Sequence, residues 1–246
     1  MMDRHEDGKP GSRKRLHALD ELRGAAVLSM VAFHAAYDLA YLYGVDMPLF
    51  TTGWIQELWR VSISWTFLAL AGWMTSLSRS NLRRGCQYVA VAVAIWIATS
   101  WAAVDTPISF GIIYCMAACT LLWWCLEHAF PQALTRWRVP AAFLCVVLFG
   151  VLYQVPRSRY AVGGLAWLGF PGPGFSSGDY YPLVPFFFLY AASALTARGW
   201  AQSHRAYPRW MYERHVPALA WLGRHALVIY AVHQVAILLA LEIIFM

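Results

Sequence analysis

The sequence RLHALDELRGAAVLSMVAFHAAYDL, residues 15–39, combines a long apolar run with ionisable residues that a membrane interior does not readily accept. Its length exceeds the roughly 20 residues that a helix needs to cross a hydrocarbon core of about 30 Å. A charged side chain at the centre of such a helix costs about 2.5–3.5 kcal/mol on insertion scales, so it faces the protein interior or a wet cavity. The stretch therefore predicts a first membrane helix that lines a polar site.

The rest of the chain has the composition of an integral membrane protein. Of its 246 residues, 60% are hydrophobic and 13% are charged, and the mean hydropathy is +0.48. A soluble domain is about 45–50% apolar and about a quarter charged, because it must cover itself with polar surface. The net charge of +6 comes with dispersed basic residues and no nucleic-acid-binding module. We therefore predict an all-α, polytopic membrane helix bundle without a nucleic-acid partner.

Seven apolar segments qualify as membrane spans, although the fifth and sixth are short for a full crossing. They cover residues 19–43, 57–78, 85–104, 108–127, 139–155, 182–198 and 219–243. Before them, residues 1–15 form a predicted disordered basic tail, and residues 16–246 form a single membrane domain. The tail is similar to the charged start of a signal peptide, but no small-residue cleavage site follows, so the first helix is predicted to be retained.

The distribution of basic residues over the loops predicts the orientation of the chain. One set of loops, 44–54, 105–107 and 156–181, contains only Arg157 and Arg159. The opposite set contains Arg79, Arg83, Arg84, Arg136, Arg138, Arg198, Arg205, Arg209 and Arg214. Since basic residues collect in cytoplasmic loops, we predict a cytoplasmic N-terminus and, with seven spans, a C-terminus outside.

Polar residues of the first predicted helix share one face. A helix turns by about 100° per residue, so Arg23 and His34, eleven positions apart, differ by only about 20°. Asp20 lies one turn below Arg23, Asp38 lies one turn above His34, and Tyr37 flanks the row. The stripe rises by about 27 Å from end to end, and it predicts a site that extends through the membrane.

Plainer interpretations of these residues remain open. Arg23 can snorkel to lipid headgroups, and Asp20 can interact with the dipole at the helix start. His34, more than halfway across, can be a buried histidine bonded to a backbone carbonyl. Asp38, at i+4, is well placed to hold the His34 imidazole in one tautomer for general base catalysis, or it is an interfacial acid.

The five cysteines predict no metal site. All lie in apolar segments, and only Cys115 and Cys119 have a spacing that brings them together on one helix. A structural zinc site takes four ligands, and no histidine or third ligand accompanies this pair. We interpret the cysteines as small buried hydrophobic residues.

Several blocks of the chain resemble a known family. The run LDELRG at 19–24, followed by FHAAYDL at 33–39, resembles the start of bacterial membrane proteins of the heparan-α-glucosaminide N-acetyltransferase catalytic-domain type, formerly classed as a domain of unknown function. The resemblance continues, in order, through LALAGW at 68–73, ISFGIIYCM at 108–116, FSSGDYYPLVPF at 175–186 and LVIYAVHQ at 227–234. The Arg-x10-His spacing is also similar to that of acyltransferase-3 membrane proteins. One departure is Val235, where the family has proline.

The resemblance implies an acyltransferase of the bacterial inner membrane. Its donor would be cytoplasmic acyl-CoA, in the first place acetyl-CoA, and its acceptor a carbohydrate or glycan-like molecule on the outer side. Arg23 and Asp20 would then serve donor binding, and His34, with Asp38, would act as a base or would carry the acyl group. The predicted acceptor or supporting residues are Tyr37, Asp179, His233 and Gln234. Asp179 alternatively caps the sixth helix.

Two other classes of function fit the same stripe. Histidine and aspartate on one face of a membrane helix also form proton relays, so the alternative is a proton-coupled transporter or channel subunit, although no inverted repeat is visible. A non-catalytic scaffold would use the polar residues to bind partner helices. The sequence leaves open which acyl group and acceptor are used, and whether the protein forms a homodimer.

Overall fold

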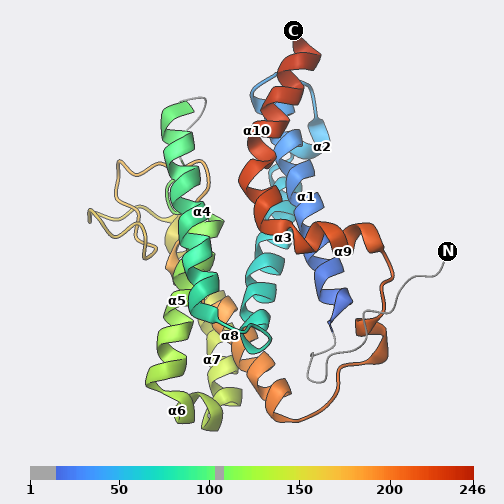
Figure 1. Ribbon diagram of the computed structural model, residues 1–246. Coiled ribbons are helices and arrows are strands. Elements are labelled where there is room, and N and C mark those ends of the chain that lie inside the picture. The colour runs from blue at the N-terminus through green and yellow to red at the C-terminus, as the bar shows by residue number, and fades with distance from the viewer. Residues whose placement is uncertain (1–14, 103–107) are drawn as a thin grey trace, which may run out of the picture.

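The computed structural model describes residues 15–102 and 108–246, which form helices joined by loops and contain no strand (Figure 1). The predicted tail, apart from Arg15, and the predicted loop 105–107 lie outside these residues. The helices are α1 (His17–Tyr41), α2 (Pro48–Thr51), α3 (Gly53–Trp73), α4 (Asn81–Ala102), α5 (Ile112–Ala129), α6 (Pro131–Arg136), α7 (Arg138–Leu152), α8 (Leu183–Gln202), α9 (Pro217–Arg224) and α10 (Ala226–Phe245). Each of the first six predicted spans overlaps one helix of 15 or more residues.

Within the described ranges, three segments are long and apolar enough to cross a membrane. They are α5, the segment Arg138–Arg157 that contains α7, and α10. Only 6% of the α7 segment and 11% of α10 are buried inside the protein, and apolar side chains such as Phe143 and Ile243 are 71% and 75% exposed. Exposed apolar surface on this scale marks contact with an apolar surrounding. The chain is a helical membrane protein.

The last predicted span, 219–243, is wrong as a single helix. The structure divides it at His225 into the short α9 and the long α10, and α9 runs across α1 while α10 lies beside it (Figure 1). Pro217 begins α9, as a proline suits the first turn of a helix. The backbone of His225 then closes α9 by donating to Trp221 and Leu222.

Close backbone contact explains why α9 lies across α1. The two helices meet at Gly24 and Gly223. A Cβ atom on Gly24 would lie 2.0 Å from the carbonyl oxygen of Leu219, and one on Gly223 would lie 1.8 Å from that of Asp20. Only glycine permits this approach, so the α1–α9 crossing depends on both residues.

Two hydrophobic clusters organise the bundle. The first joins α3, α5, α7 and α8, and the second joins α1, α2 and α3. Helix α3 belongs to both, through Leu68 in the first cluster and Phe67 in the second. Tyr230 of α10 also packs against both. The second cluster and α10 together position the polar face of α1.

Candidate functional site

The centre of the candidate site is a pair of histidines on adjacent helices. His34 of α1 and His233 of α10 have ring centroids 4.9 Å apart with an interplanar angle of 61°. His34 is partly buried and its ring also meets the edge of Phe33. The structure thus brings together two predicted site residues that are far apart in the sequence.

Asp38 lies one turn above His34 and connects α1 to α10. Its side chain is almost completely buried, with the residue 2% exposed, and its Oδ2 accepts a hydrogen bond of 2.8 Å from Nε2 of Gln234. The prediction that Asp38 also holds the His34 imidazole in one tautomer stays a prediction. A buried carboxylate requires donors, and the amide on α10 supplies one. Higher up, the Tyr43 hydroxyl bonds the Glu242 carboxylate at 3.1 Å.

His233 is oriented by its own helix. Its Nδ1 lies 2.7 Å from the carbonyl oxygen of Tyr230. Helix α10 runs through Val235 without a break, so the loss of the family's proline leaves the helix continuous. Tyr37 lies outside the pair: it is exposed and its ring packs on Tyr41, with centroids 4.8 Å apart.

The opposite end of the stripe is an ionic cluster beside α9. Asp20 is 5% exposed and accepts hydrogen bonds from Arg15 and, at 3.3 Å, from Nη1 of Arg23. The same Nη1 donates to the carbonyl oxygen of Gly223 at 3.4 Å. Arg23 and Asp20 therefore form one contact, and this contact also connects α1 to α9.

Asp179 caps α5 and not the sixth predicted helix, whose capping was the alternative to its predicted role in acceptor binding. Its Oδ2 accepts a 3.0 Å hydrogen bond from the backbone N–H of Ile112, at the start of α5. Gly111 makes room, because a Cβ there would lie 2.9 Å from this oxygen. Burial raises the pKa of the Asp179 carboxyl, while the Ile112 hydrogen bond and the charge of Arg60 act in the opposite direction. Two of the recognised blocks, around 108–116 and 175–186, thus meet at one helix end.

Replacing Asp179 by alanine is expected to destabilise the protein by about 0.5–2 kcal/mol, the usual loss for a helix N-cap. The amide oxygen of Asp179→Asn can still accept the Ile112 hydrogen bond, so this variant should stay close to the wild type. Thermal unfolding of the purified protein in detergent measures both. Equal stability of the alanine variant and the wild type would contradict the capping role.

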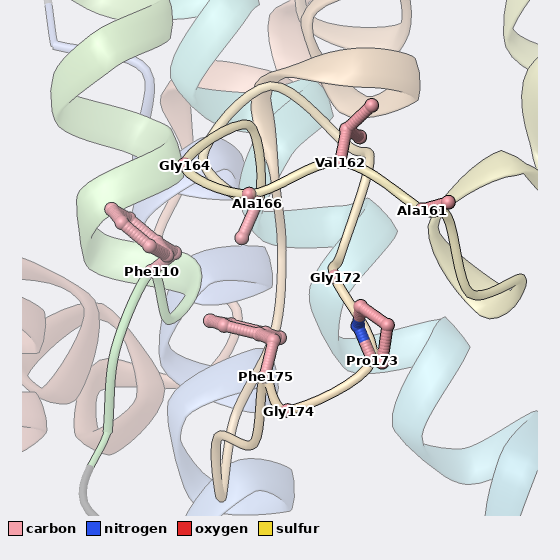
Figure 2. Close-up of a pocket in the computed structure, with 10 residues that line it drawn as sticks. Phe110, Ala161, Val162, Gly164, Ala166, Gly172, Pro173, Gly174 and Phe175 are labelled. Atoms are coloured by element: carbon pink, nitrogen blue, oxygen red, sulfur yellow. The ribbon is translucent and has the colours of Figure 1, made fainter.

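A cavity of about 620 Å³ lies within the long loop between α7 and α8 (Figure 2). Phe110 and Phe175 line one side, with their rings stacked at 6.1 Å. The rest of the wall comes from small residues and glycines, including Gly164 and Gly172. Arg159 holds the loop by donating to backbone carbonyls of Gly172 and Phe175. Asp179 does not line this cavity.

A charged cluster at the start of α3, formed by Glu57, Arg60 and Arg157, was not predicted from the sequence. Arg60 makes a two-pronged hydrogen bond with Glu57 and donates to the Tyr181 hydroxyl at 2.9 Å. Arg157 also binds Glu57, and its guanidinium lies 4.2 Å from the ring centroid of Tyr153. The sequence did contain a signal for this cluster. Glu57 and Arg60 lie three residues apart inside the apolar segment 57–78, and charged residues in such a segment need partners within the protein.

The described residues contain no group of three or more histidine, cysteine, aspartate or glutamate side chains that could hold a metal ion. Cys115 and Cys119 lie side by side on α5, with Sγ atoms 3.8 Å apart, and both are buried. This placement is that of small hydrophobic residues in the first cluster. Cys86 and Cys125 are exposed, so the interpretation of all five cysteines as buried is wrong for these two.

One known protein family matches almost the whole chain. The sequence model of the family described as heparan-alpha-glucosaminide N-acetyltransferase, catalytic, matches residues 15–235. That range runs from the start of α1 into α10, and it contains His34, Asp38, His233 and Gln234. No curated protein and no solved structure matches the chain. Because the match covers far more than half of the chain, the protein belongs to the heparan-α-glucosaminide N-acetyltransferase catalytic family.

Proposed function

We propose that the protein is an integral membrane acyltransferase that moves an acyl group, in the first place acetyl, from cytoplasmic acyl-CoA to a sugar-type acceptor on the outer side of a bacterial inner membrane. His34 acts in this reaction as the base or as the acyl carrier. The observation that carries the proposal is the His34–His233 pair between α1 and α10, in a chain of an acetyltransferase family. A thioester is already activated, so the protein mainly supplies position and proton transfer.

The proposed topology has seven spans, a cytoplasmic N-terminus and an external C-terminus. The loop arginines support it through the positive-inside rule. So does the arrangement of α1 and α10, which run side by side in the same direction and are joined at Asp38–Gln234 and Tyr43–Glu242 (Figure 1). First and last spans of equal direction require an odd number of crossings.

The cytoplasmic end of the stripe supports binding of a phosphorylated donor. Only Nη1 of Arg23 has a hydrogen-bond partner among the described residues, so Nη2 and Nε have donor capacity left for an anion. Further positive groups lie close by. Burial and the charges of Arg214, Arg15 and Arg224 lower the pKa of His17, which precedes the predicted first span. Such a collection of cations suits the phosphates of CoA.

The proposed activity is tested by incubating the purified full-length protein in lipid nanodiscs with acetyl-CoA labelled in the acetyl group. We expect label to appear in glucosamine or another amino sugar offered as acceptor, together with release of free CoA. A protein that neither binds nor cleaves acetyl-CoA would overturn the proposal. Proton uptake by sealed proteoliposomes without acetyl-CoA cleavage would instead indicate the proton-coupled transporter.

Arg23→Ala is expected to weaken acetyl-CoA binding by roughly 10- to 100-fold, because a hydrogen bond to a charged group contributes about 1.5–3 kcal/mol. The rate at saturating donor should change much less. Arg23→Lys keeps the charge but loses the planar fork, so it should recover only part of the affinity. Isothermal titration with acetyl-CoA provides the measurement. An unchanged Kd with a lowered Tm would show that Arg23 serves only the α1–α9 contact.

A further inference from the structure

The two histidines differ in how the protein holds them. A carbonyl oxygen only accepts hydrogen bonds, so Nδ1 of His233, at 2.7 Å from the Tyr230 carbonyl, carries the proton. The neutral ring must then present a lone pair at Nε2. The ring of His34 is only partly buried. The protein thus fixes the tautomer of His233 and exposes part of His34.

Nε2 of His233 is an unusual atom for a protein interior. It is buried, and it has no hydrogen-bond partner among the described residues. Buried polar atoms are nearly always paired, and an exception in a native structure calls for an explanation such as a catalytic role. A buried lone pair of defined position is what a general base requires.

The position of this atom also restricts the group that it can serve. Because Nε2 is shielded from solvent, a bound acceptor molecule does not reach it in this arrangement. Two polar rings contact His233: that of Tyr230 on its own helix, at a centroid distance of 5.5 Å, and that of His34 on α1, at 4.9 Å. His34 itself is only partly buried, so it can meet a substrate on one side and His233 on the other.

We infer that His233 is the general base that takes the proton of His34 while His34 attacks the acyl donor. The inference rests on the proposed function, and it selects the acyl-carrier role for His34. The Tyr230 carbonyl, His233 and His34 then form the three-part arrangement of orienting group, base and nucleophile. Hydrogen bonds of this kind are often long before substrate binds and shorten in the complex.

The chemical steps balance without a further reactant. One ring nitrogen of His34 forms a bond to the thioester carbonyl carbon, the C–S bond breaks, and the proton on the other ring nitrogen moves to Nε2 of His233. The departing thiolate takes up a proton from the medium and leaves as CoA thiol, while His233 keeps the proton of His34. The acceptor next attacks the acyl group, the C–N bond between this group and His34 breaks, and His233 returns its proton to the His34 ring. The acceptor's own proton passes to the medium and replaces the one that the thiolate took up.

The test measures protein-bound label after rapid mixing of the full-length protein with labelled acetyl-CoA, without acceptor. We expect the wild type to acquire label and His34→Ala to acquire none. His233→Ala should acquire label about 10²- to 10⁴-fold more slowly, as for loss of a general base, with an unchanged Kd for acetyl-CoA. Added imidazole should restore part of the rate in His233→Ala, which a purely structural defect would not allow.

A second variant guards against misfolding. The amide of His233→Gln can still donate to the Tyr230 carbonyl, but it offers no basic nitrogen, so it should be as slow as His233→Ala while keeping the wild-type Tm. Labelling of either variant at the wild-type rate would overturn the inference. Acetyl transfer by a wild type that never carries label would also overturn it and would leave the proposed function standing. Absence of both labelling and transfer would remove the proposed function itself.

Discussion

His34→Ala is expected to lose acetyl transfer by at least about 10²- to 10⁴-fold, the range that proton transfer alone contributes in enzymes. His34 is the only partly accessible member of the pair that it forms with His233, so the reacting groups have no other route to the buried Nε2 atom. Affinity for acetyl-CoA should remain close to that of the wild type, because the proposed donor-binding residues lie at the other end of α1. The expected loss is therefore one of kcat.

The matched control for this variant is His128→Ala. His128 lies in the last turn of α5, it is exposed, and its ring bonds only the carbonyl of Trp124 among the described residues. It has no place in the proposed chemistry, so its removal should leave kcat unchanged. Steady-state rates with labelled acetyl-CoA and a fixed acceptor give the comparison. If His34→Ala and His128→Ala are both as active as the wild type, His34 is not part of the catalytic machinery.

Gly223→Ala is expected to be the most damaging of the small substitutions. The added methyl group would lie 1.8 Å from the carbonyl oxygen of Asp20, which is backbone and has no rotamer to change. Helix α9 must therefore move away from α1. Overpacking of this kind costs typically 1–3 kcal/mol, and we expect about 3 kcal/mol here, which lowers Tm by roughly 6–12 °C in a chain of this size.

Gly150→Ala is the corresponding control. Gly150 is a helical residue of α7, and a Cβ there meets nothing within 4 Å. Alanine favours the helix by roughly 0.8–1 kcal/mol over glycine, so its Tm should be equal to or slightly above that of the wild type. Thermal unfolding in one detergent gives both values. Equal Tm values for Gly223→Ala and the wild type would mean that the α1–α9 crossing is looser than the structure shows.

Local periodicity explains why the helices and the stripe of α1 were predictable. The spacing of Arg23 and His34 places them on one face whatever the rest of the chain does. The same local rule says less about Asp38. Spacing at i+4 states that two side chains can meet on one helix, but not which donors arrive from another helix. Gln234 lies 196 residues further along the chain, so only the tertiary structure reveals its contact with Asp38.

The other differences between prediction and structure also arise from contacts between segments that are distant in the sequence. Asp179 precedes α8 and was predicted either to bind the acceptor or to cap α8. It caps α5 instead, because the segments around Ser109 and Ser177 are hydrogen-bonded to each other. The apolar run 219–243 hides the break at His225, since apolar residues continue through it. Gly24 and Gly223 allow α9 to cross α1 only because they face each other, and the sequence does not show that they meet. Family resemblance located His233 and Gln234 in the site but did not specify their hydrogen bonds.

The two polar links between α1 and α10 have a consequence for the membrane in which the protein works. A mismatch between the length of a span and the thickness of the bilayer strains helices by fractions of a kcal/mol per ångström, and helices respond by tilting. The Asp38–Gln234 and Tyr43–Glu242 bonds fix the axial register of α1 against α10 at two heights. If both helices span the bilayer as proposed, we expect them to tilt together instead of sliding, so that the separation of His34 and His233 changes little with lipid composition.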